Sequence, residues 1–586
     1  MPPFARFRPA LIATIAAGAL VIRPLPAQTP ADSAQARRVT ALADRYVSAY
    51  VALFPISAEL NGMTLARHDA LDDNSLAALG RWRATEDSLW AALQGLDARS
   101  LTGTPEWVTY GFLREALEAA RAQRVCRSEL WPVNQVSGWQ ARFAKLADQQ
   151  PVGTPANRAD ALVRWQRVPK YIDVEIANLR AGVKAGYTAP KRLVELVIGQ
   201  LDELVAAAPA QSPFYGPAAR DSTAEFRAAW ARLLTDGIAP AARRYRDYLR
   251  DEYLASARSN VAVTANPNGL ACYRASFRSF TSIDRAPEET SALGERTVAR
   301  YESEVKAMGQ RLFGTTVLDS IQTRLRSDSA NHLRDRDAVL AAARDAVGRG
   351  HEATPKWFDP APRTSVVVTP VPEFLERTAS PSYMPAPEDG SRPATFRIVL
   401  FQPDKQLRSN LELVAAHETY PGHHVQLALA LERRGAHPIT RLVGTSAFAE
   451  GWARYAEALA EEMGLYSSDR TRIARRTWPA HGMVVDPGIH VFGWSRERAV
   501  RYVLATGRTT PGATEALIDR TIAWPGQLTS YDTGGLLIFA LREKAQRELG
   551  PAFDIKRFHN AVLGQGTVTL PMLEQQVNQW IASEKR

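Results

Sequence analysis

The chain has 586 residues, of which 45% are apolar and 23% are charged. These proportions are ordinary for a soluble globular protein and exclude a disordered or fibrous one. The formal net charge of +10 comes from scattered arginines, with no basic block interleaved with aromatic residues, so the sequence argues against a nucleic-acid partner.

The first 27 residues have the pattern of a secretory signal peptide. Arg6 and Arg8 precede an apolar run at 10–22, and residues 25–27 (LPA) resemble a small-residue cleavage site. The run is about 13 residues long, whereas a membrane-spanning helix needs roughly 20. We therefore expect a cleaved signal, with a membrane anchor as the alternative. The mature chain is expected in the periplasm or outside the cell, without stable insertion in a membrane.

Most of the mature chain has apolar residues at three- and four-residue spacing, which is typical of amphipathic helices. We expect helices at about 36–54, 75–97, 105–123, 190–207, 223–258, 287–312, 334–347, 446–463, 496–505, 513–520, 535–548 and 571–583. The sequence thus predicts a mainly α protein with a single body at 28–586. A boundary near 260–270 would divide it into an N-terminal lobe at about 28–265 and a second lobe at about 266–586.

The sequence contains two cysteines and two short runs that are typical of β-strands. Cys126 and Cys272 are the two cysteines, and in an oxidising compartment they either pair or remain isolated buried thiols. Residues 365–370 (SVVVTP) and 394–400 (ATFRIVL) are β-branched runs bounded by turn-forming residues. We expect them to form a small antiparallel β element beside the histidine-rich stretch that follows.

That stretch, at 417–424, reads HETYPGHH and contains three of the ten histidines. A zinc-binding His-Glu-x-x-His helix places its second histidine four residues after the first, but a proline occupies that position here. On an unbroken helix the later histidines would lie roughly 9 to 10 Å further along the axis, which is too far to share an ion with His417. The proline and the following glycine are therefore expected to break or bulge the helix.

The spacing alone leaves open which later histidine binds the metal. A bulge of two inserted residues favours His423, whereas a tighter break favours His424, to which we give a slight preference. The third ligand is expected on the next helix, where Glu450 lies among small alanines and a buried carboxylate needs a partner. An ion pair between Glu450 and Arg454, one turn away, is the structural alternative. Glu418 has the position of the base that takes a proton from water.

The motif HExxPGHH, followed at 450–457 by EGWARYAE, resembles the bacterial family catalogued as domain of unknown function 885, which is regarded as a group of gluzincin-type metallopeptidases. Further segments that resemble this family are 132–135 (PVNQ), 485–490 (VDPGIH), 493–496 (GWSR) and 525–527 (PGQ). The resemblance implies a two-lobed, mainly helical metallopeptidase-like fold with a central cleft, similar to thimet oligopeptidase and angiotensin-converting enzyme.

The resemblance also implies roles for particular residues. One zinc ion would be bound by His417, by His423 or His424, and by Glu450. His490 and Tyr531 would donate hydrogen bonds to the oxyanion. A short strand beside the metal helix would pair with an extended substrate, and the segment 395–400 with Phe396 is the candidate. Arg392 and Arg496 are the candidates for recognising a substrate carboxylate.

The expected function is that of a secreted or periplasmic zinc-dependent hydrolase that cleaves oligopeptides, with a peptide or small amide as its partner. Two alternatives remain from the sequence. One is a metal-dependent hydrolase of a non-peptide amide or ester, and the other is a catalytically inactive secreted binding protein of the same fold.

Overall fold

The computed structural model describes residues 30–585 except 102–103, 372, 374–375, 377–379, 387–391, 434, 444–445 and 508. The predicted signal peptide at 1–27 lies outside the described residues. In the described part of the chain, no helix combines the length and the apolar character needed to cross a membrane.

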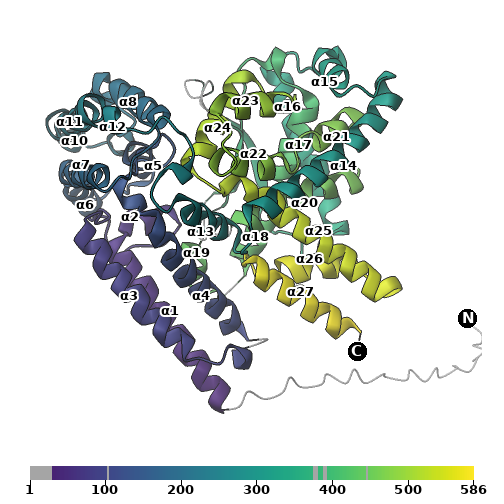
Figure 1. Cartoon of the computed structure of the whole chain (residues 1–586), viewed down its shortest axis with the longest axis horizontal. Coiled ribbons are helices and arrows are strands. Elements are labelled where there is room, and N and C mark those ends of the chain that lie inside the picture. The colour runs from purple at the N-terminus through teal and green to yellow at the C-terminus, as the bar shows by residue number, and fades with distance from the viewer. Residues whose placement is uncertain are drawn as a thin grey trace, which may run out of the picture.

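Helices dominate the structure, as predicted, and form two groups in Figure 1. The purple and blue group comprises α1 (Pro30–Leu53), α2 (Pro55–Leu60), α3 (Leu76–Gln94), α4 (Pro105–Gln123), α5 (Trp139–Gln149), α6 (Pro155–Trp165), α7 (Val168–Lys184), α8 (Lys191–Ala206), α9 (Gly216–Arg220), α10 (Ala224–Arg232), α11 (Ala239–Tyr248) and α12 (Leu254–Ser256).

The second group comprises the later helices, coloured teal to yellow, of which α13 and α19 lie beside α4. Its members are α13 (Gly269–Thr281), α14 (Pro287–Phe313), α15 (Leu318–Ser327), α16 (Arg336–Ala353), α17 (Arg408–Glu418), α18 (His423–Glu432), α19 (Ile439–Leu442), α20 (Ser446–Glu462), α21 (Asp469–Arg476), α22 (His481–His490), α23 (Arg496–Leu504), α24 (Pro511–Ala523), α25 (Ser530–Leu549), α26 (Ile555–Leu563) and α27 (Leu570–Glu584).

The described residues contain one three-stranded sheet, with β1 (Val366–Pro370), β2 (Ser382–Met384) and β3 (Ala394–Ile398) in the order β1-β3-β2. The two predicted strands, β1 and β3, run parallel, and the unpredicted β2 pairs with β3 in the antiparallel direction. The sheet is therefore mixed, which corrects the expected antiparallel element. It differs because β3 is central and takes a partner on each side.

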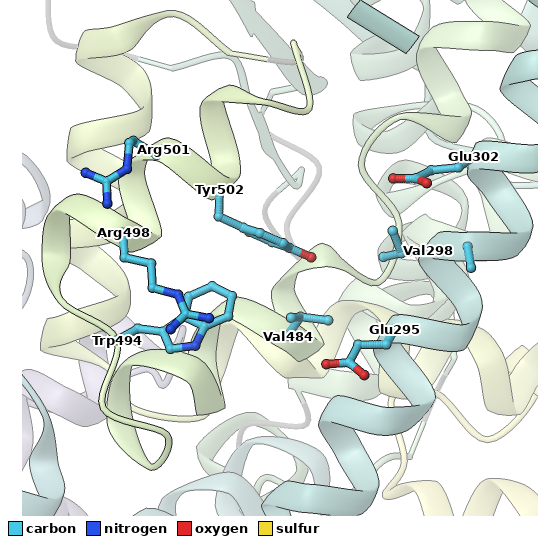
Figure 2. A pocket seen from close by; sticks show the side chains of 9 residues that line it. Glu295, Val298, Glu302, Val484, Trp494, Arg498, Arg501 and Tyr502 are labelled. Atoms are coloured by element: carbon cyan, nitrogen blue, oxygen red, sulfur yellow. The ribbon is translucent and has the colours of Figure 1, made fainter. Parts of the chain in front are cut away.

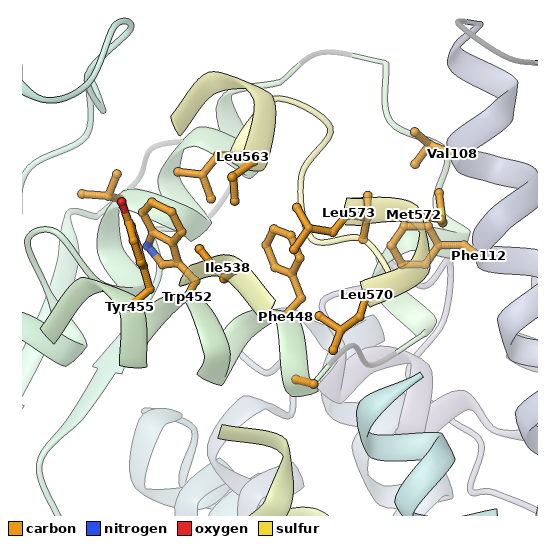
Figure 3. Packing of buried hydrophobic residues seen from close by; sticks show 14 of the residues in the cluster. Val108, Phe112, Phe448, Trp452, Tyr455, Ile538, Leu563, Leu570, Met572 and Leu573 are labelled. Atoms are coloured by element: carbon orange, nitrogen blue, oxygen red, sulfur yellow. The ribbon is translucent and has the colours of Figure 1, made fainter. Parts of the chain in front are cut away.

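The largest hydrophobic core joins the beginning and the end of the chain. Val108 and Phe112 of α4 belong to the same cluster as Phe448 of α20 and Leu573 of α27 (Figure 3). A second cluster is formed by residues of α2 and of the helices from α5 to α11. The cores thus do not follow the predicted boundary near 260–270, because α1, α3 and α4 share a core with the histidine-bearing helices.

Helices α20 and α25 meet through two glycines. A Cβ atom on Gly534 would lie 1.7 Å from the carbonyl oxygen of Ala447, and one on Gly451 would lie 2.5 Å from the backbone of Gly534. Only residues without a side chain allow this approach. The contact fixes α20, which carries Glu450 and Glu457, against α25.

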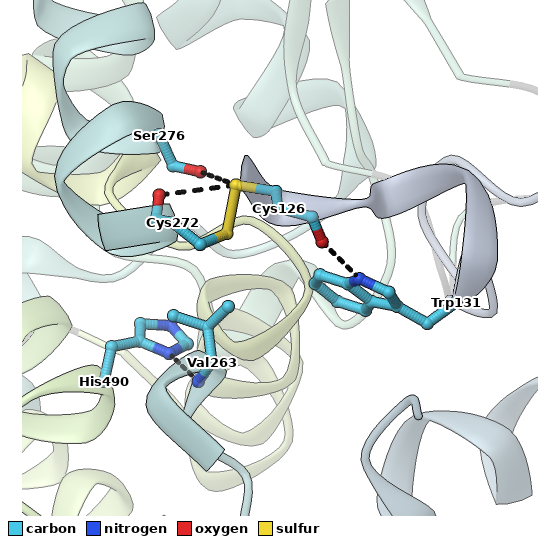
Figure 4. The surroundings of a disulfide bond; sticks show 6 residues. All are labelled: Cys126, Trp131, Val263, Cys272, Ser276 and His490. Carbon is cyan, nitrogen blue, oxygen red and sulfur yellow. Dashed lines mark hydrogen bonds between the residues drawn. A yellow bond between two sulfur atoms is a disulfide. The ribbon is translucent and has the colours of Figure 1, made fainter. Parts of the chain in front are cut away.

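Cys126 and Cys272 form a disulfide bond between a short 3-10 turn after α4 and helix α13 (Figure 4). Their Cα atoms lie 4.7 Å apart, although 146 positions separate them in the sequence. Of the two alternatives that the sequence leaves open, the structure therefore has the paired one.

We expect the Cys126→Ala/Cys272→Ala double variant to lose about 2–5 kcal/mol of free energy of unfolding. The physical reason is that the bond closes a long loop and so restricts the unfolded chain. Denaturant unfolding of the oxidised wild type, the reduced wild type and the double variant measures the effect. Equal stability of all three proteins would contradict the prediction.

Candidate metal centre

The stretch HETYPGHH forms the end of one helix, a break and the start of another. Helix α17 ends at Glu418, the Tyr420–Pro421 peptide bond is cis, and α18 begins at His423. A Cβ atom on Gly422 would lie 1.9 Å from the carbonyl oxygen of His417, so a glycine is required there by close backbone approach. The predicted break of the helix is confirmed.

The break brings His417, His423 and Glu450 together. The Nε2 atoms of His417 and His423 lie 3.5 and 3.6 Å from Oε2 of Glu450, and one donor atom from each residue lies within 4.8 Å of the others. Ligand atoms around a tetrahedral zinc ion stand about 3.3 Å apart, given bond lengths near 2.0–2.2 Å. The chemistry and the spacing of these donors therefore fit a zinc ion.

A second carboxylate orients His417. Its Nδ1 donates to Oε1 of Glu457 over 2.9 Å, which leaves Nε2 directed at Glu450. Burial by itself lowers the pKa of His417, but hydrogen bonds to Glu450 and Glu457 outweigh it and raise that pKa to about 10. Burial raises the pKa of Glu450, but hydrogen bonds and charges from His417 and His423 outweigh it and hold that pKa well below its usual range. Metal binding would therefore release the proton from His417.

Glu457 is in turn held by a buried arginine. Nη1 of Arg454 donates to both carboxylate oxygens of Glu457, over 3.0 and 2.8 Å, and its Nε lies 3.1 Å from Oδ1 of Asp532 on α25. Arg454 thus pairs with Glu457 and Asp532. The alternative interpretation from the sequence, an ion pair between Glu450 and Arg454, is not what the structure has. The arrangement is the carboxylate support that metal-binding histidines commonly have.

His424 points away from the cluster, contrary to the slight preference for it. It is fully buried, and its Nε2 donates to the carbonyl oxygen of Thr364 over 2.9 Å. Its Nδ1 accepts from the hydroxyl of Tyr383 over 3.1 Å. Burial lowers the pKa of His424 to about 4. Because both ring nitrogens have partners, neither is free to bind a metal, and the wider break places His423 in the ligand position.

Glu418 lies beside the cluster, next to the edge of the sheet. Its Oε2 accepts a hydrogen bond from the backbone N–H of Tyr383 on β2 over 3.0 Å. Its negative charge contributes to raising the pKa of His417, which places the carboxylate close to that ring. The strand next to Glu418 is therefore β2 and not the predicted segment 395–400.

Of the two expected oxyanion donors, the structure brings one to the cluster. The ring of Tyr531 stacks on that of His417 with a centroid distance of 6.5 Å, and burial together with the charge of Glu450 raises the pKa of Tyr531. His490, in contrast, is fully buried near the disulfide (Figure 4). Its Nδ1 accepts from the N–H of Val263 and its Nε2 donates to the carbonyl of Thr521, so both nitrogens serve the fold.

The three residues expected to contact a substrate differ in their accessibility. Phe396 is fully buried because its side chain packs into the largest hydrophobic core, so it is not available to a substrate. Arg496 is bound to Asp519 over 2.7 and 3.0 Å and is committed to that ion pair. Arg392 is exposed, and its positive charge acts on Tyr383, so it remains near β2.

Two residues of the site were not assigned roles from the sequence. The signal for Glu457 was present, because it lies two turns after Glu450 on the same face of α20. Tyr383 gave no signal, since β2 has three residues in a proline-containing segment (PSYMP). Its position depends on a long-range strand pairing.

Comparisons with known proteins found one matching family and solved structures with a similar fold. A model of the family described as "Bacterial protein of unknown function (DUF885)" matches residues 55–577. The structure is similar to that of a "putative lipoprotein" from Colwellia psychrerythraea (23% identity, TM-score 0.84, 94% of this chain and 99% of that one). It is also similar to a "putative lipoprotein of unknown function" from Shewanella oneidensis (20% identity, TM-score 0.74, 91% and 98%).

No curated protein sequence matches the chain. At identities under 25% the two structures establish a shared fold over nearly the whole length of each chain. The family model covers far more than half of the sequence. The chain therefore belongs to the DUF885 family of bacterial proteins.

Proposed function

We propose that this protein is a zinc-dependent hydrolase that cleaves peptides. The observation that carries the proposal is the convergence of His417, His423 and Glu450, with Glu418 directly after the first of them. Three such donors leave a fourth position open, as in catalytic rather than structural zinc sites. The proposal includes a two-lobed, peptidase-like arrangement with a central substrate cleft.

A zinc ion bound there supplies Lewis acidity toward a water molecule and toward a substrate carbonyl group. Glu418 takes a proton from the water as its oxygen bonds to the carbonyl carbon. When the C–N bond breaks, Glu418 passes that proton to the departing nitrogen. Tyr531, close to His417 and Glu450, is the donor available to the developing oxyanion.

The position of β2 favours an extended peptide as the substrate. Among the strands of the described residues, β2 has β3 as its one neighbour, so no strand pairs with its other edge. The N–H of Tyr383 points from that edge to Glu418. A peptide added to this edge would lie beside the proposed base, by strand addition. Arg392, exposed near Tyr383, is the arginine placed to meet a substrate carboxylate.

We further propose a periplasmic or secreted location. The disulfide between Cys126 and Cys272 favours an oxidising compartment, and two proteins of the same fold are described as "putative lipoprotein". The pattern of residues 1–27 agrees with export.

The Glu418→Gln variant tests the proposed reaction. We expect about one zinc ion per chain in both wild type and variant, because Glu418 is not a ligand. Hydrolysis of a mixed peptide library should fall by about 10²–10⁴-fold in the variant, the usual contribution of a general acid or base. Metal analysis and mass spectrometry of the library measure the two quantities.

Three outcomes would count against the proposal. If the wild type contains no metal and a chelator changes nothing, a binding protein without turnover is the better description. If small amides or esters are cleaved and peptides are not, the substrate class is wrong. If Glu418→Gln retains full activity, Glu418 is not the base.

A further inference from the structure

A cavity of about 570 Å³ lies between α14 and the helices α22 and α23. Figure 2 shows that Glu295 and Glu302 of α14 form one wall, and that Arg498 and Arg501 of α23 form the other. Tyr502 and Trp494 lie between them, with Val298, Ala299 and Val484 completing the lining. None of these residues belongs to the cluster of His417, His423 and Glu450.

Glu295, Arg498 and Arg501 are exposed at the mouth of this cavity, and Glu302 is half-buried. Among the described residues, none forms a side-chain hydrogen bond or ion pair with these four, although the charge of Arg501 acts on Glu497 of the same helix. Arg498 instead lies over the ring of Trp494, 4.3 Å from its centroid. The opposite charges therefore face each other across the cavity without neutralising each other in direct contact.

The two aromatic residues of the cavity contact each other. Tyr502 packs edge-on against Trp494 with a centroid distance of 5.1 Å, and its hydroxyl is 3.1 Å from Nδ1 of His481. Burial, followed by the charges of Glu295 and Glu302, raises the pKa of Tyr502, which places both carboxylates near its hydroxyl. The centre of the cavity is thus an uncharged aromatic surface between a negative and a positive wall.

We propose that this cavity binds small zwitterions, namely free amino acids or dipeptides with an apolar or aromatic side chain. The ammonium group would lie toward Glu295 and Glu302, and the carboxylate toward Arg498 and Arg501, since guanidinium groups bind carboxylates with matched geometry. The apolar body would lie on Trp494. A simple cation or a simple anion would use one wall and leave the other unpaired, and the volume suits a molecule of this size.

The cavity lies near the residues that orient His417 in the candidate metal centre. His481, which is bonded to Tyr502, has its pKa lowered to about 4 by burial and by the charge of Arg454. Arg454 holds Glu457, and Glu457 orients His417. The proposed ligand is also the kind of product that peptide hydrolysis releases, but the binding proposal rests on the cavity and not on hydrolysis.

Calorimetric titration with L-phenylalanyl-L-alanine tests the proposal. The Glu418→Gln variant serves as the host protein, so that the dipeptide is not consumed. We expect saturable binding that weakens at least about tenfold in the added double variants Arg498→Ala/Arg501→Ala and Glu295→Gln/Glu302→Gln, because each removes charged hydrogen-bonding partners. N-acetylation or C-amidation of the dipeptide should weaken binding similarly.

Matched controls on α14 are Arg296→Ala and Glu288→Gln, which change exposed charges outside the cavity and should leave affinity unchanged. Thermal unfolding confirms that each variant is folded. Absence of binding, or equal binding by the blocked dipeptides, would overturn the proposal. If binding is lost in His423→Ala and kept in the cavity variants, the dipeptide occupies the metal centre, so this proposal fails while the proposed function stands.

Discussion

Replacing His423 with alanine is expected to abolish binding of the proposed zinc ion and to leave the fold intact. Replacing His424 is expected to preserve zinc binding and to lower the stability of the fold. His423 directs its Nε2 at Oε2 of Glu450, its ring lies edge-on to that of His417, and its Nδ1 makes a long contact of 3.4 Å with Gln426. Removing even a group that only supports a ligand weakens metal affinity by about 10–100-fold. Losing His423 itself should weaken it by more than about 100-fold.

The His424→Ala variant leaves two polar groups and a void inside the protein. The hydroxyl of Tyr383 and the carbonyl of Thr364 lose their partner, and each unpaired buried group costs about 1–3 kcal/mol. With the cavity added, we expect a loss of about 2–5 kcal/mol in the free energy of unfolding. Zinc content should stay near that of the wild type.

Metal analysis and denaturant unfolding of the two purified variants distinguish these expectations. The histidines are adjacent in sequence, so each variant is the control for the other. Loss of zinc from His424→Ala with full zinc in His423→Ala would show that the geometry around Glu450 misidentifies the ligand.

The second large effect is expected at Arg454. An Arg454→Met variant would leave the carboxylates of Glu457 and Asp532 buried without their cation. Removing one member of a buried ion pair costs about 3–5 kcal/mol. Because Glu457 would also lose its orientation toward His417, we expect zinc affinity to fall by about 10–100-fold.

Arg475→Met is the matched control for this substitution. Arg475 is also buried and pairs with Glu461 over 2.8 Å, but it does not contact the metal centre. It should lower stability and leave zinc affinity unchanged. Equilibrium competition with a chromophoric chelator measures the affinity, and an Arg454→Met protein that binds zinc as tightly as the wild type would show that Arg454 serves only the fold.

Local patterns were sufficient to predict the parts of the site that lie close together in sequence. The broken helix at 417–424 follows from a proline and a glycine where the helix must end, and Glu450 follows from a carboxylate among small alanines on the next helix. The choice between His423 and His424 depends on how far the backbone turns after Glu418. Contacts from α20 set that turn. One of them is the indole N–H of Trp452, which donates to the carbonyls of Pro421 and Gly422.

His490 ends a buried helix and does not lie with the metal-ligand candidates. Pro487 with Gly482 and Gly488 is typical of a turn, but the structure has a buried helix, α22, over this stretch. Cβ atoms on the two glycines would meet the carbonyl of Leu528 at 2.6 Å and the ring of Trp494 at 2.7 Å. These glycines therefore serve close packing, and tertiary burial overrides the local preference for a turn.

The contact between Gly451 and Gly534 affects which mutations the metal centre can withstand. Two helices that meet through bulky side chains shift when those side chains change shape, but at Gly451 and Gly534 the two main chains meet directly. The placement of α20, which carries Glu450, against α25 is therefore set in part by main-chain contact and is less sensitive to the gradual exchange of core residues. The same contact makes these two glycines the positions where a single added methyl group would push α20 away from α25.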